Sequence, residues 1–256
     1  MASSRYVVVV VSVALAASAL SCRRAADGSR RTGPVASTGV AASATAGPTA
    51  LAPVDPPGTY LGRTLATPMS YRGADWLDRG DRETTEQPEH VLDVLALREG
   101  STVADVGAGS GYFTVRIARR VGPRGRVLAT DLQPEMLALL RDKVTKAGLG
   151  NVIPILATEG DAKLPRREVD LVLMVDVYHE LPKPSETLAQ VRAALRPDGR
   201  LALVEYRGED PNVPIKEEHK MTLAQIKKEL GASGFAFRAS DESLPQQRIV
   251  VFAVAP

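Results

Sequence analysis

The chain has 256 residues, of which 44% are hydrophobic, and a formal net charge of +2, which suits one sizeable globular domain with additional segments. Scattered basic residues and only 4% aromatic residues argue against a nucleic-acid partner. A single cysteine excludes an intramolecular disulfide, and His90, His179 and His219 match no metal-binding spacing, so no metal site is expected.

The first residues predict export. Arg5 precedes an apolar run over residues 6–20, shorter than the roughly 20 residues of a membrane span and typical of a signal peptide over 1–21. The sequence ALSC that ends this stretch resembles a bacterial lipoprotein signal, which would place a lipid anchor on Cys22. A simple cleaved signal with a periplasmic product, an uncleaved anchor, and a misplaced start with a cytoplasmic product stay open.

The next two segments carry little periodicity. Residues 22–58 are rich in Ala, Ser, Gly and Pro, with too few large apolar side chains to offset the entropy of ordering, and predict a disordered linker. Residues 59–87 are polar around Trp76, the only tryptophan, and predict a lid-like segment; ordinary packing of Trp76 against the core is the alternative.

From residue 88 to 256, strand and helix patterns alternate, which predicts an α/β fold with a parallel sheet covered on both faces. The last two strands have no helix between them, so we expect an antiparallel hairpin at the sheet edge. The predicted elements, in chain order, are a helix at 88–98, a strand at 102–106, a helix at 112–121, a strand at 126–130, a helix at 134–148, strands at 152–157 and 169–175, a helix around 188–195, a strand at 200–206, a helix opened by a capping box at Thr222, and strands at 235–239 and 248–254.

A glycine-rich turn follows the first of these strands. Its glycines are Gly107, Gly109 and Gly111, a GxGxG pattern one residue shorter than the GxGxxG of dinucleotide enzymes. Glycines permit close backbone approach to a ligand at the N-terminus of a helix. Asp131, twenty residues after Gly111, can accept hydrogen bonds from both ribose hydroxyls. The pattern predicts a nucleoside ligand without naming it.

Four segments together narrow the choice: VADVGAGSGYFTV, VLATDLQPEML, DLVLMVDVYHEL and LRPDGRLALVE. In this order and spacing they resemble class I S-adenosylmethionine-dependent methyltransferases, over about residues 86–256. The resemblance implies a Rossmann-like seven-stranded sheet, with the last strand antiparallel and helices on both faces, and S-adenosylmethionine as the cofactor. It further implies a methyltransferase domain at 88–256.

The resemblance also implies roles for single residues. Asp105, Gly107 and Gly109 would line the methionine end of the cofactor, Asp131 would bind the ribose, and Leu132 would pack on the adenine. An acidic residue is expected near the adenine amino group, either Asp161 or Glu159. The expected cofactor-binding residues are Asp105, Gly107, Ala108, Gly109, Gly111, Asp131, Leu132, Asp161 and Asp176.

A sulfonium methyl group is already activated, so the protein must only align an acceptor and, where needed, remove a proton. The segment DVYHE, 176–180, directly follows a buried strand and should face the substrate. His179 and Glu205 are the expected catalytic residues, with a structural histidine as the alternative. The predicted function is methyl transfer to a small molecule. Because methyl donor is made in the cytoplasm, an exported, non-catalytic binding protein on this fold stays open, as does a nicotinamide oxidoreductase.

Overall fold

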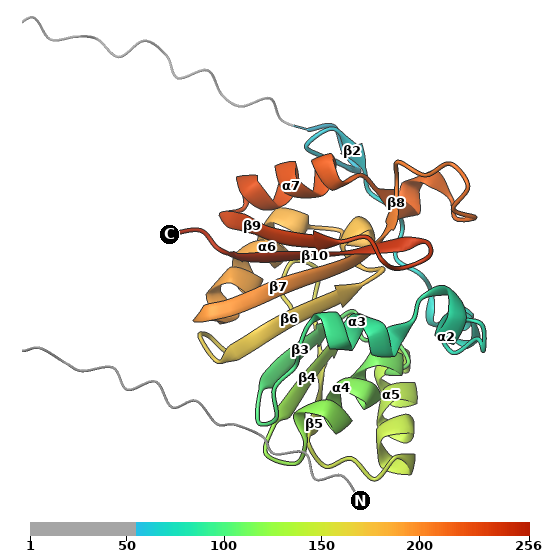
Figure 1. Ribbon diagram of the computed structural model, residues 1–256, viewed down its shortest axis with the longest axis vertical. Helices are drawn as coiled ribbons and strands as arrows, with labels where there is room; N and C mark the ends of the chain where they lie inside the picture. The colour runs from blue at the N-terminus through green and yellow to red at the C-terminus, as the bar shows by residue number, and fades with distance from the viewer. Residues whose placement is uncertain (1–54) are drawn as a thin grey trace, which may run out of the picture. The chain divides into compact units, whose positions relative to one another are not determined.

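A mixed β-sheet of eight strands runs through residues 55–256, the part of the chain that the computed structural model describes (Figure 1). The strands are β3 (Thr102–Val106), β4 (Arg126–Asp131), β5 (Val152–Leu156), β6 (Val169–Val175), β7 (Leu195–Arg207), β8 (Lys220–Met221), β9 (Phe235–Asp241) and β10 (Gln247–Val254). Seven of them follow the order β5-β4-β3-β6-β7-β10-β9. Strands β3 to β7 pair in parallel, whereas β10 is antiparallel to both β7 and β9. This confirms the predicted α/β class, the Rossmann-like seven-strand path and the hairpin at its edge.

The sheet differs from the sequence-based expectation at β8 and at the start of β7. The two-residue strand β8 pairs with β7 beyond the seven-strand path and carries too few residues to show a periodic pattern. Strand β7 begins at Leu195 rather than at residue 200, because Leu195 pairs with Val169 before a register shift brings Arg200 opposite Leu171.

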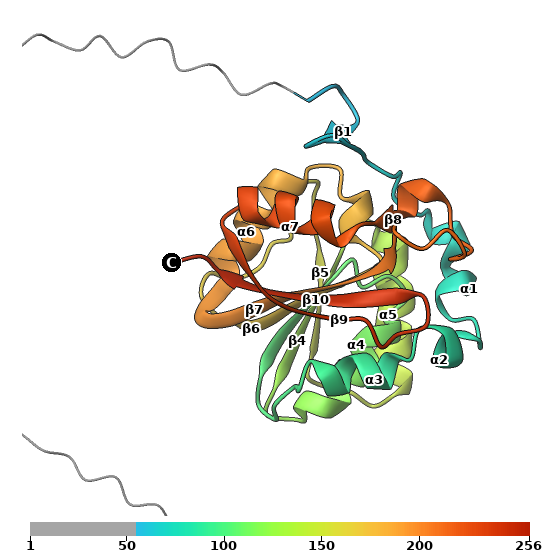
Figure 2. The ribbon, with the colours of Figure 1, turned by 45° about the horizontal axis from the view of Figure 1, so that its top comes forward.

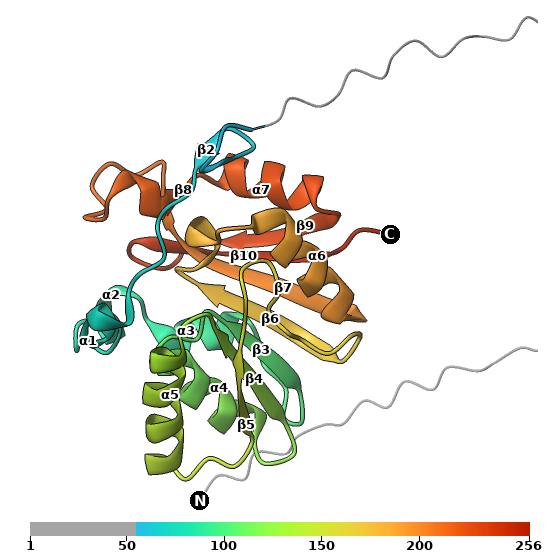
Figure 3. The ribbon, with the colours of Figure 1, turned by 180° about the vertical axis from the view of Figure 1, so that it is seen from behind.

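Helices cover both faces of the sheet (Figures 1 and 3). One face packs against α3 (Pro88–Val94), α4 (Tyr112–Val121) and α5 (Pro134–Lys146), and the other against α6 (Pro184–Ala194) and α7 (Leu223–Ala232). The helix expected at 88–98 ends earlier, at Val94. At the start of α7, the Thr222 hydroxyl accepts a hydrogen bond from the Gln225 backbone N–H (3.1 Å). The Gln225 side chain instead contacts Glu229 and the Leu61 carbonyl, so only half of the predicted capping box forms.

The segment before α3 contains a hairpin of β1 (Thr59–Tyr60) and β2 (Arg63–Thr64), a 3-10 turn η1 (Tyr71–Gly73), and two single-turn helices, α1 (Ala74–Leu77) and α2 (Arg82–Thr85). The hairpin lies beside α7, and α1 and α2 lie near the end of the sheet that carries β8 (Figure 2). The expected signal peptide, Cys22 and most of the expected linker lie outside the described residues. Among the described residues, no helix combines the length and apolar character needed to cross a membrane.

Candidate functional site

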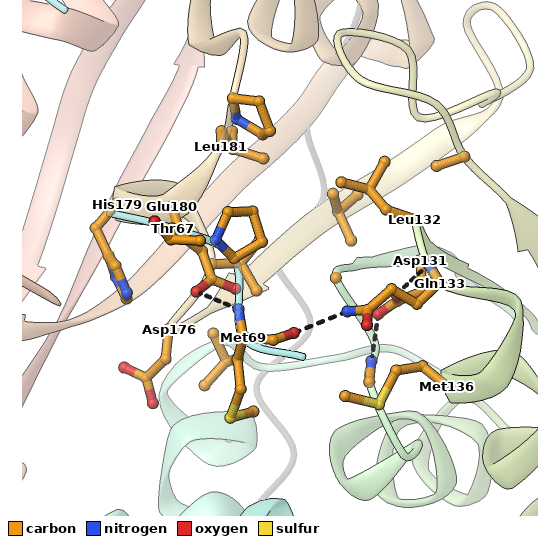
Figure 4. A pocket seen from close by; sticks show the side chains of 18 of the residues that line it. Thr67, Met69, Asp131, Leu132, Gln133, Met136, Asp176, His179, Glu180 and Leu181 are labelled. Carbon is orange, nitrogen blue, oxygen red and sulfur yellow. Dashed lines mark hydrogen bonds between the residues drawn. The ribbon is translucent and has the colours of Figure 1, made fainter. Parts of the chain in front are cut away.

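A cavity of about 480 Å³ opens at the carboxyl ends of the parallel strands (Figure 4). Ligand sites of open α/β sheets lie at this edge, and the volume is within the roughly 300–1,000 Å³ of small-molecule pockets. Its walls come from the turns after β3, β4, β5 and β6, from the segment between β7 and β8, and from the segment that precedes α3. Part of the expected lid-like segment, including Thr67, Met69 and Trp76, lines this cavity.

The glycine turn between β3 and α4 forms one wall. Gly107 has a φ of 71°, and a Cβ atom built on it would lie 2.5 Å from Val177 Cγ2. Gly109 has a φ of 54°, and its Cβ would lie 2.7 Å from Leu77 Cδ1. Any larger residue would therefore be strained in its backbone and crowded by its neighbours. Both glycines line the cavity, whereas Ala108 and Gly111 do not.

The carboxylate of Asp131, at the end of β4, lies next to this turn. One oxygen accepts a hydrogen bond from the Gly109 N–H (2.9 Å) and the other from the Gln133 N–H (2.9 Å). Burial raises the pKa of Asp131, and these backbone donors act in the opposite direction. Each carboxylate oxygen keeps a further lone pair for a ligand hydroxyl. Leu132 and Met136 add apolar surface beside it.

Asp105 lies behind the glycine turn and does not line the cavity. Its carboxylate accepts a hydrogen bond from the Thr114 hydroxyl (2.6 Å). Burial raises the pKa of Asp105 to about 6, although the Thr114 hydrogen bond lowers it. Asp105 therefore holds the base of the turn to α4 rather than meeting a ligand directly.

The two acidic residues considered for the adenine end are placed differently. Asp161 accepts hydrogen bonds from the ammonium (2.7 Å) and the backbone N–H (2.8 Å) of Lys163, and it is not among the residues lining the cavity. Lys163 also lowers the pKa of Asp161. Glu159 lines the cavity, so the structure favours the alternative position over Asp161.

At the opposite end of the cavity, His179 follows β6 in a short 3-10 turn and is 2% exposed. Its Nδ1 lies 2.6 Å from a carboxylate oxygen of Glu205, and its Nε2 lies 3.0 Å from His219 Nδ1. Burial alone would lower the pKa of His179, but Glu205 raises it, and the net direction is upward. Both ring nitrogens are thus engaged, and His179 does not present a free nitrogen to the cavity by itself.

Glu205 is fully buried and does not line the cavity. One of its oxygens contacts His179 and the other accepts a hydrogen bond from the Tyr178 N–H (2.9 Å). Glu205 is therefore placed as a positioning residue for His179. Asp176 does line the cavity; it has a φ of 53°, and its carboxylate accepts hydrogen bonds from the Gln247 amide (2.8 Å). Burial, and then the charges of Glu86 and Glu205, raise the pKa of Asp176 well above its usual value.

Several lining residues were missed by sequence reasoning. His219 is one, because forty residues separate it from His179 and no motif joins them, so their spacing did not indicate that the two side chains meet. Met69 is another: its N–H donates to Glu180 (3.2 Å) and its carbonyl accepts from the Gln133 side chain (2.8 Å), so its backbone crosses between the two ends (Figure 4). Burial raises the pKa of Glu180 to about 7.

The first end of the cavity fits an adenosyl cofactor. The two glycines leave space that a Cβ would fill, Asp131 offers oxygen acceptors, and the buried Thr130 hydroxyl has no hydrogen-bond partner among the described residues. Apolar side chains line much of the remaining wall. These are the groups expected to hold a ribose, a nearby polar tail and a flat base.

The comparisons with known proteins agree. Residues 103–199 match the model of a methyltransferase domain. Protein-L-isoaspartate O-methyltransferase of Korarchaeum cryptofilum is 31% identical over 169 residues, 57% of this chain and 76% of that protein. The ubiquinone/menaquinone biosynthesis C-methyltransferase UbiE of a Marinomonas species is 30% identical over 118 residues, 46% of this chain and 47% of that protein.

A solved structure of a SAM-dependent methyltransferase from Aquifex aeolicus has 28% identity and a TM-score of 0.70, covering 73% of this chain and 100% of that chain. The chain spans only about half the length of several curated relatives, for example 55% of the isoaspartate methyltransferase of Aeropyrum pernix. The stretch that matches the family model contains the glycine turn and strands β4, β5 and β6. The chain belongs to the class I S-adenosylmethionine-dependent methyltransferases.

Proposed function

We propose that the protein transfers the methyl group of S-adenosylmethionine to a small-molecule acceptor. The observation that carries the proposal is one continuous cavity with two chemically different ends. Gly107, Gly109 and Asp131 lie at the first end, and His179 and Glu180 lie at the second. A cofactor held at the first end would face an acceptor held at the second.

Each residue at the cofactor end has a definite task. The Asp131 carboxylate accepts hydrogen bonds from the ribose hydroxyls, while the backbone at Gly107 and Gly109 approaches the methionine part closely. Leu132 packs against the adenine, and Glu159 accepts from its amino group. When bound, the cofactor supplies an activated methyl group, so the protein contributes mainly orientation and exclusion of water.

The acceptor end supplies polar groups within an otherwise apolar wall. His179, held by Glu205, forms a pair with His219, and Glu180 and Asp176 add carboxylates. In this proposal the cluster binds the polar atom of the acceptor and takes up its proton. Because both nitrogens of His179 are engaged, the histidine pair rather than His179 alone performs this task.

Calorimetric titration with S-adenosylmethionine, S-adenosylhomocysteine and NAD tests the proposal. We expect the first two to bind and NAD not to bind. Binding of NAD alone would support the oxidoreductase reading and overturn ours. Small molecules that co-purify with the protein, identified by mass spectrometry, then serve as candidate acceptors. Cofactor binding without transfer to any of them would favour the non-catalytic binding protein.

We also propose, from the sequence alone, that the protein is exported and carries a lipid on Cys22. The apolar run over residues 6–20 and the ALSC sequence support this. Cell fractionation with mass analysis of the N-terminus is the test. An unmodified chain that keeps its first residues and stays in the cytoplasmic fraction would contradict it.

A further inference from the structure

A second feature of the acceptor end is a cluster of three potential metal ligands. One ligand atom each from His179, Glu180 and His219 lies within 4.8 Å of the others. The two imidazoles meet edge to face, with ring centroids 5.0 Å apart and an interplanar angle of 80°. His179 is buried, whereas Glu180 and His219 are half-buried and border the cavity, so an ion could enter from that side.

The surroundings of His179 are those of a metal-binding histidine. Its Nδ1 contacts the buried carboxylate of Glu205 at 2.6 Å, an arrangement that orients the ring and fixes its tautomer in many metal sites. With the Nδ1 proton donated to Glu205, the Nε2 lone pair points at His219 Nδ1, 3.0 Å away. Without an ion, a proton lies between these two nitrogens in a hydrogen bond, and a metal ion could take its place.

The charge balance favours a cation. Asp176 and Glu180 line the cavity, and Glu205 lies directly behind His179. Among the ion pairs of the described residues, none joins any of these three carboxylates to a lysine or arginine; Glu205 pairs only with His179. Two cationic side chains also line the cavity: Lys216, and Arg82, which pairs with Glu86. Burying carboxylates without a cationic partner is costly, and either protonation or a divalent ion relieves that cost.

We propose that His179 Nε2, His219 Nδ1 and a Glu180 carboxylate oxygen bind a divalent transition-metal ion, for which Zn²⁺ is the probe. Two imidazoles and one carboxylate suit Zn²⁺ and its neighbours, whereas Mg²⁺ and Ca²⁺ prefer oxygen ligands. Zinc–nitrogen bonds of about 2.0–2.1 Å in a tetrahedral site require the two nitrogens to be roughly 3.3 Å apart. The observed 3.0 Å needs to open by only a few tenths of an ångström.

Glu180 can join without dismantling its surroundings. The Met69 N–H binds only one of its two carboxylate oxygens, Oε2, at 3.2 Å. The other oxygen accepts no hydrogen bond from the described residues. Three protein ligands would leave a coordination position open for a further ligand.

The role of the ion, unlike its binding, rests on the proposed function. An ion here would hold an acceptor through a hydroxyl or thiol group and lower the pKa of that group, and the proton would leave to water, because the nitrogens of the histidine pair bind the ion. The acceptor class is therefore a small molecule whose oxygen or sulfur can ligate a metal, next to the cofactor end of the cavity.

The test uses the full chain without a histidine tag, stripped of metal with a chelator and titrated with ZnCl₂ by calorimetry. We expect one equivalent of zinc per chain and a higher melting temperature with zinc. His219→Ala and Glu180→Gln should each weaken zinc binding by more than about tenfold. His90→Ala is the matched control, because His90 contacts Ser243 away from the cavity and should leave zinc binding unchanged. Cys22→Ser, which removes the only thiol, should likewise leave zinc binding unchanged.

S-adenosylhomocysteine binding, measured on the same samples, separates the two proposals. The metal site is overturned if the wild type binds no more zinc than His219→Ala, even if S-adenosylhomocysteine binds. It is also overturned if His90→Ala loses as much zinc binding as His219→Ala. Zinc binding with no S-adenosylhomocysteine binding would support the metal site and remove the proposed function. Melting curves of His219→Ala and Glu180→Gln without zinc, matching the wild type, show that a loss of zinc is not a loss of folding.

Discussion

The carboxylate of Asp131 accepts a hydrogen bond from the backbone N–H of Gly109 at 2.9 Å, which joins the end of β4 to the turn after β3. The same carboxylate borders the cavity. One side chain thus shapes the glycine turn and offers acceptor oxygens to a ligand. The cofactor end depends on both contributions.

Replacement of Asp131 by Ala should weaken binding of S-adenosylhomocysteine by about 1–3 kcal/mol, the cost of losing a charged hydrogen-bond partner. Calorimetry measures this directly. Asp142→Ala is the control, because Asp142 pairs with Lys146 on the exposed face of α5. Equal affinity of wild type and Asp131→Ala would show that the ribose assignment is mistaken.

Gly107→Ala should reduce both cofactor binding and stability. Its positive φ costs a residue with a side chain about 1–2 kcal/mol, and the new Cβ would lie 2.5 Å from Val177. The double variant Gly107→Ala with Val177→Ala should recover the part of the stability loss that crowding causes, but not the part that backbone strain causes. Gly150→Ala, with no atom within 4 Å of its new Cβ, should be neutral. Urea unfolding and calorimetry check each variant, and a neutral Gly107→Ala would contradict the close approach.

Asp105 should make stability depend on pH. Because burial raises the folded-state pKa of Asp105 from 3.8 to about 6, the protonated carboxyl stabilises the fold at low pH. This contribution is complete below the unfolded pKa and is lost as pH rises through about 6, with about 3 kcal/mol as the upper limit. Asp105→Asn should therefore gain stability over the wild type at pH 7.5 but not near pH 4. Urea midpoints at both pH values test this, and a difference that does not change with pH would refute it.

The hairpin before the cavity is held by a buried ion pair. Arg63 binds both oxygens of Glu229, which is fully buried and also accepts from the Tyr178 hydroxyl. Arg63→Met should cost about 3 kcal/mol, because it leaves a buried carboxylate without its cation. The double variant Arg63→Met with Glu229→Met should recover most of that loss. Urea unfolding of each variant tests this prediction. Lys146→Met, at an exposed position, is the control and should not measurably change the free energy of unfolding.

Trp76, the only tryptophan, lines the cavity and is 39% exposed. Its intrinsic fluorescence should change when S-adenosylhomocysteine binds, because the ligand alters the polarity around the indole. In Asp131→Ala the same change should require a higher ligand concentration. A titration in which calorimetry detects binding and fluorescence stays constant would place the ligand away from Trp76.

The sequence by itself determined the fold and the place of Gly107, Gly109 and Asp131 at the edge of the sheet. Nearly continuous apolar strands, such as the one ending at Val175, alternate with amphipathic helices, and this alternation can be recognised from the sequence alone. Gly107 and Gly109 follow their strand directly, so their place at the sheet edge is set by chain order. Asp131 ends the next strand, so chain order also sets its place at this edge.

Only the tertiary structure decided the acceptor end. His219 meets His179 because the chain after β7 returns across the edge of the sheet, and no local pattern encodes that path. Glu205 proved to lie behind His179 rather than in the cavity, because a side chain near the end of a strand can point to either face of the sheet. The carboxylate of Asp161 points toward Lys163, because local hydrogen bonds rather than position in a motif decide its direction. Chain order fixes which strand ends meet at the sheet edge, while long-range packing fixes which side chains face each other there.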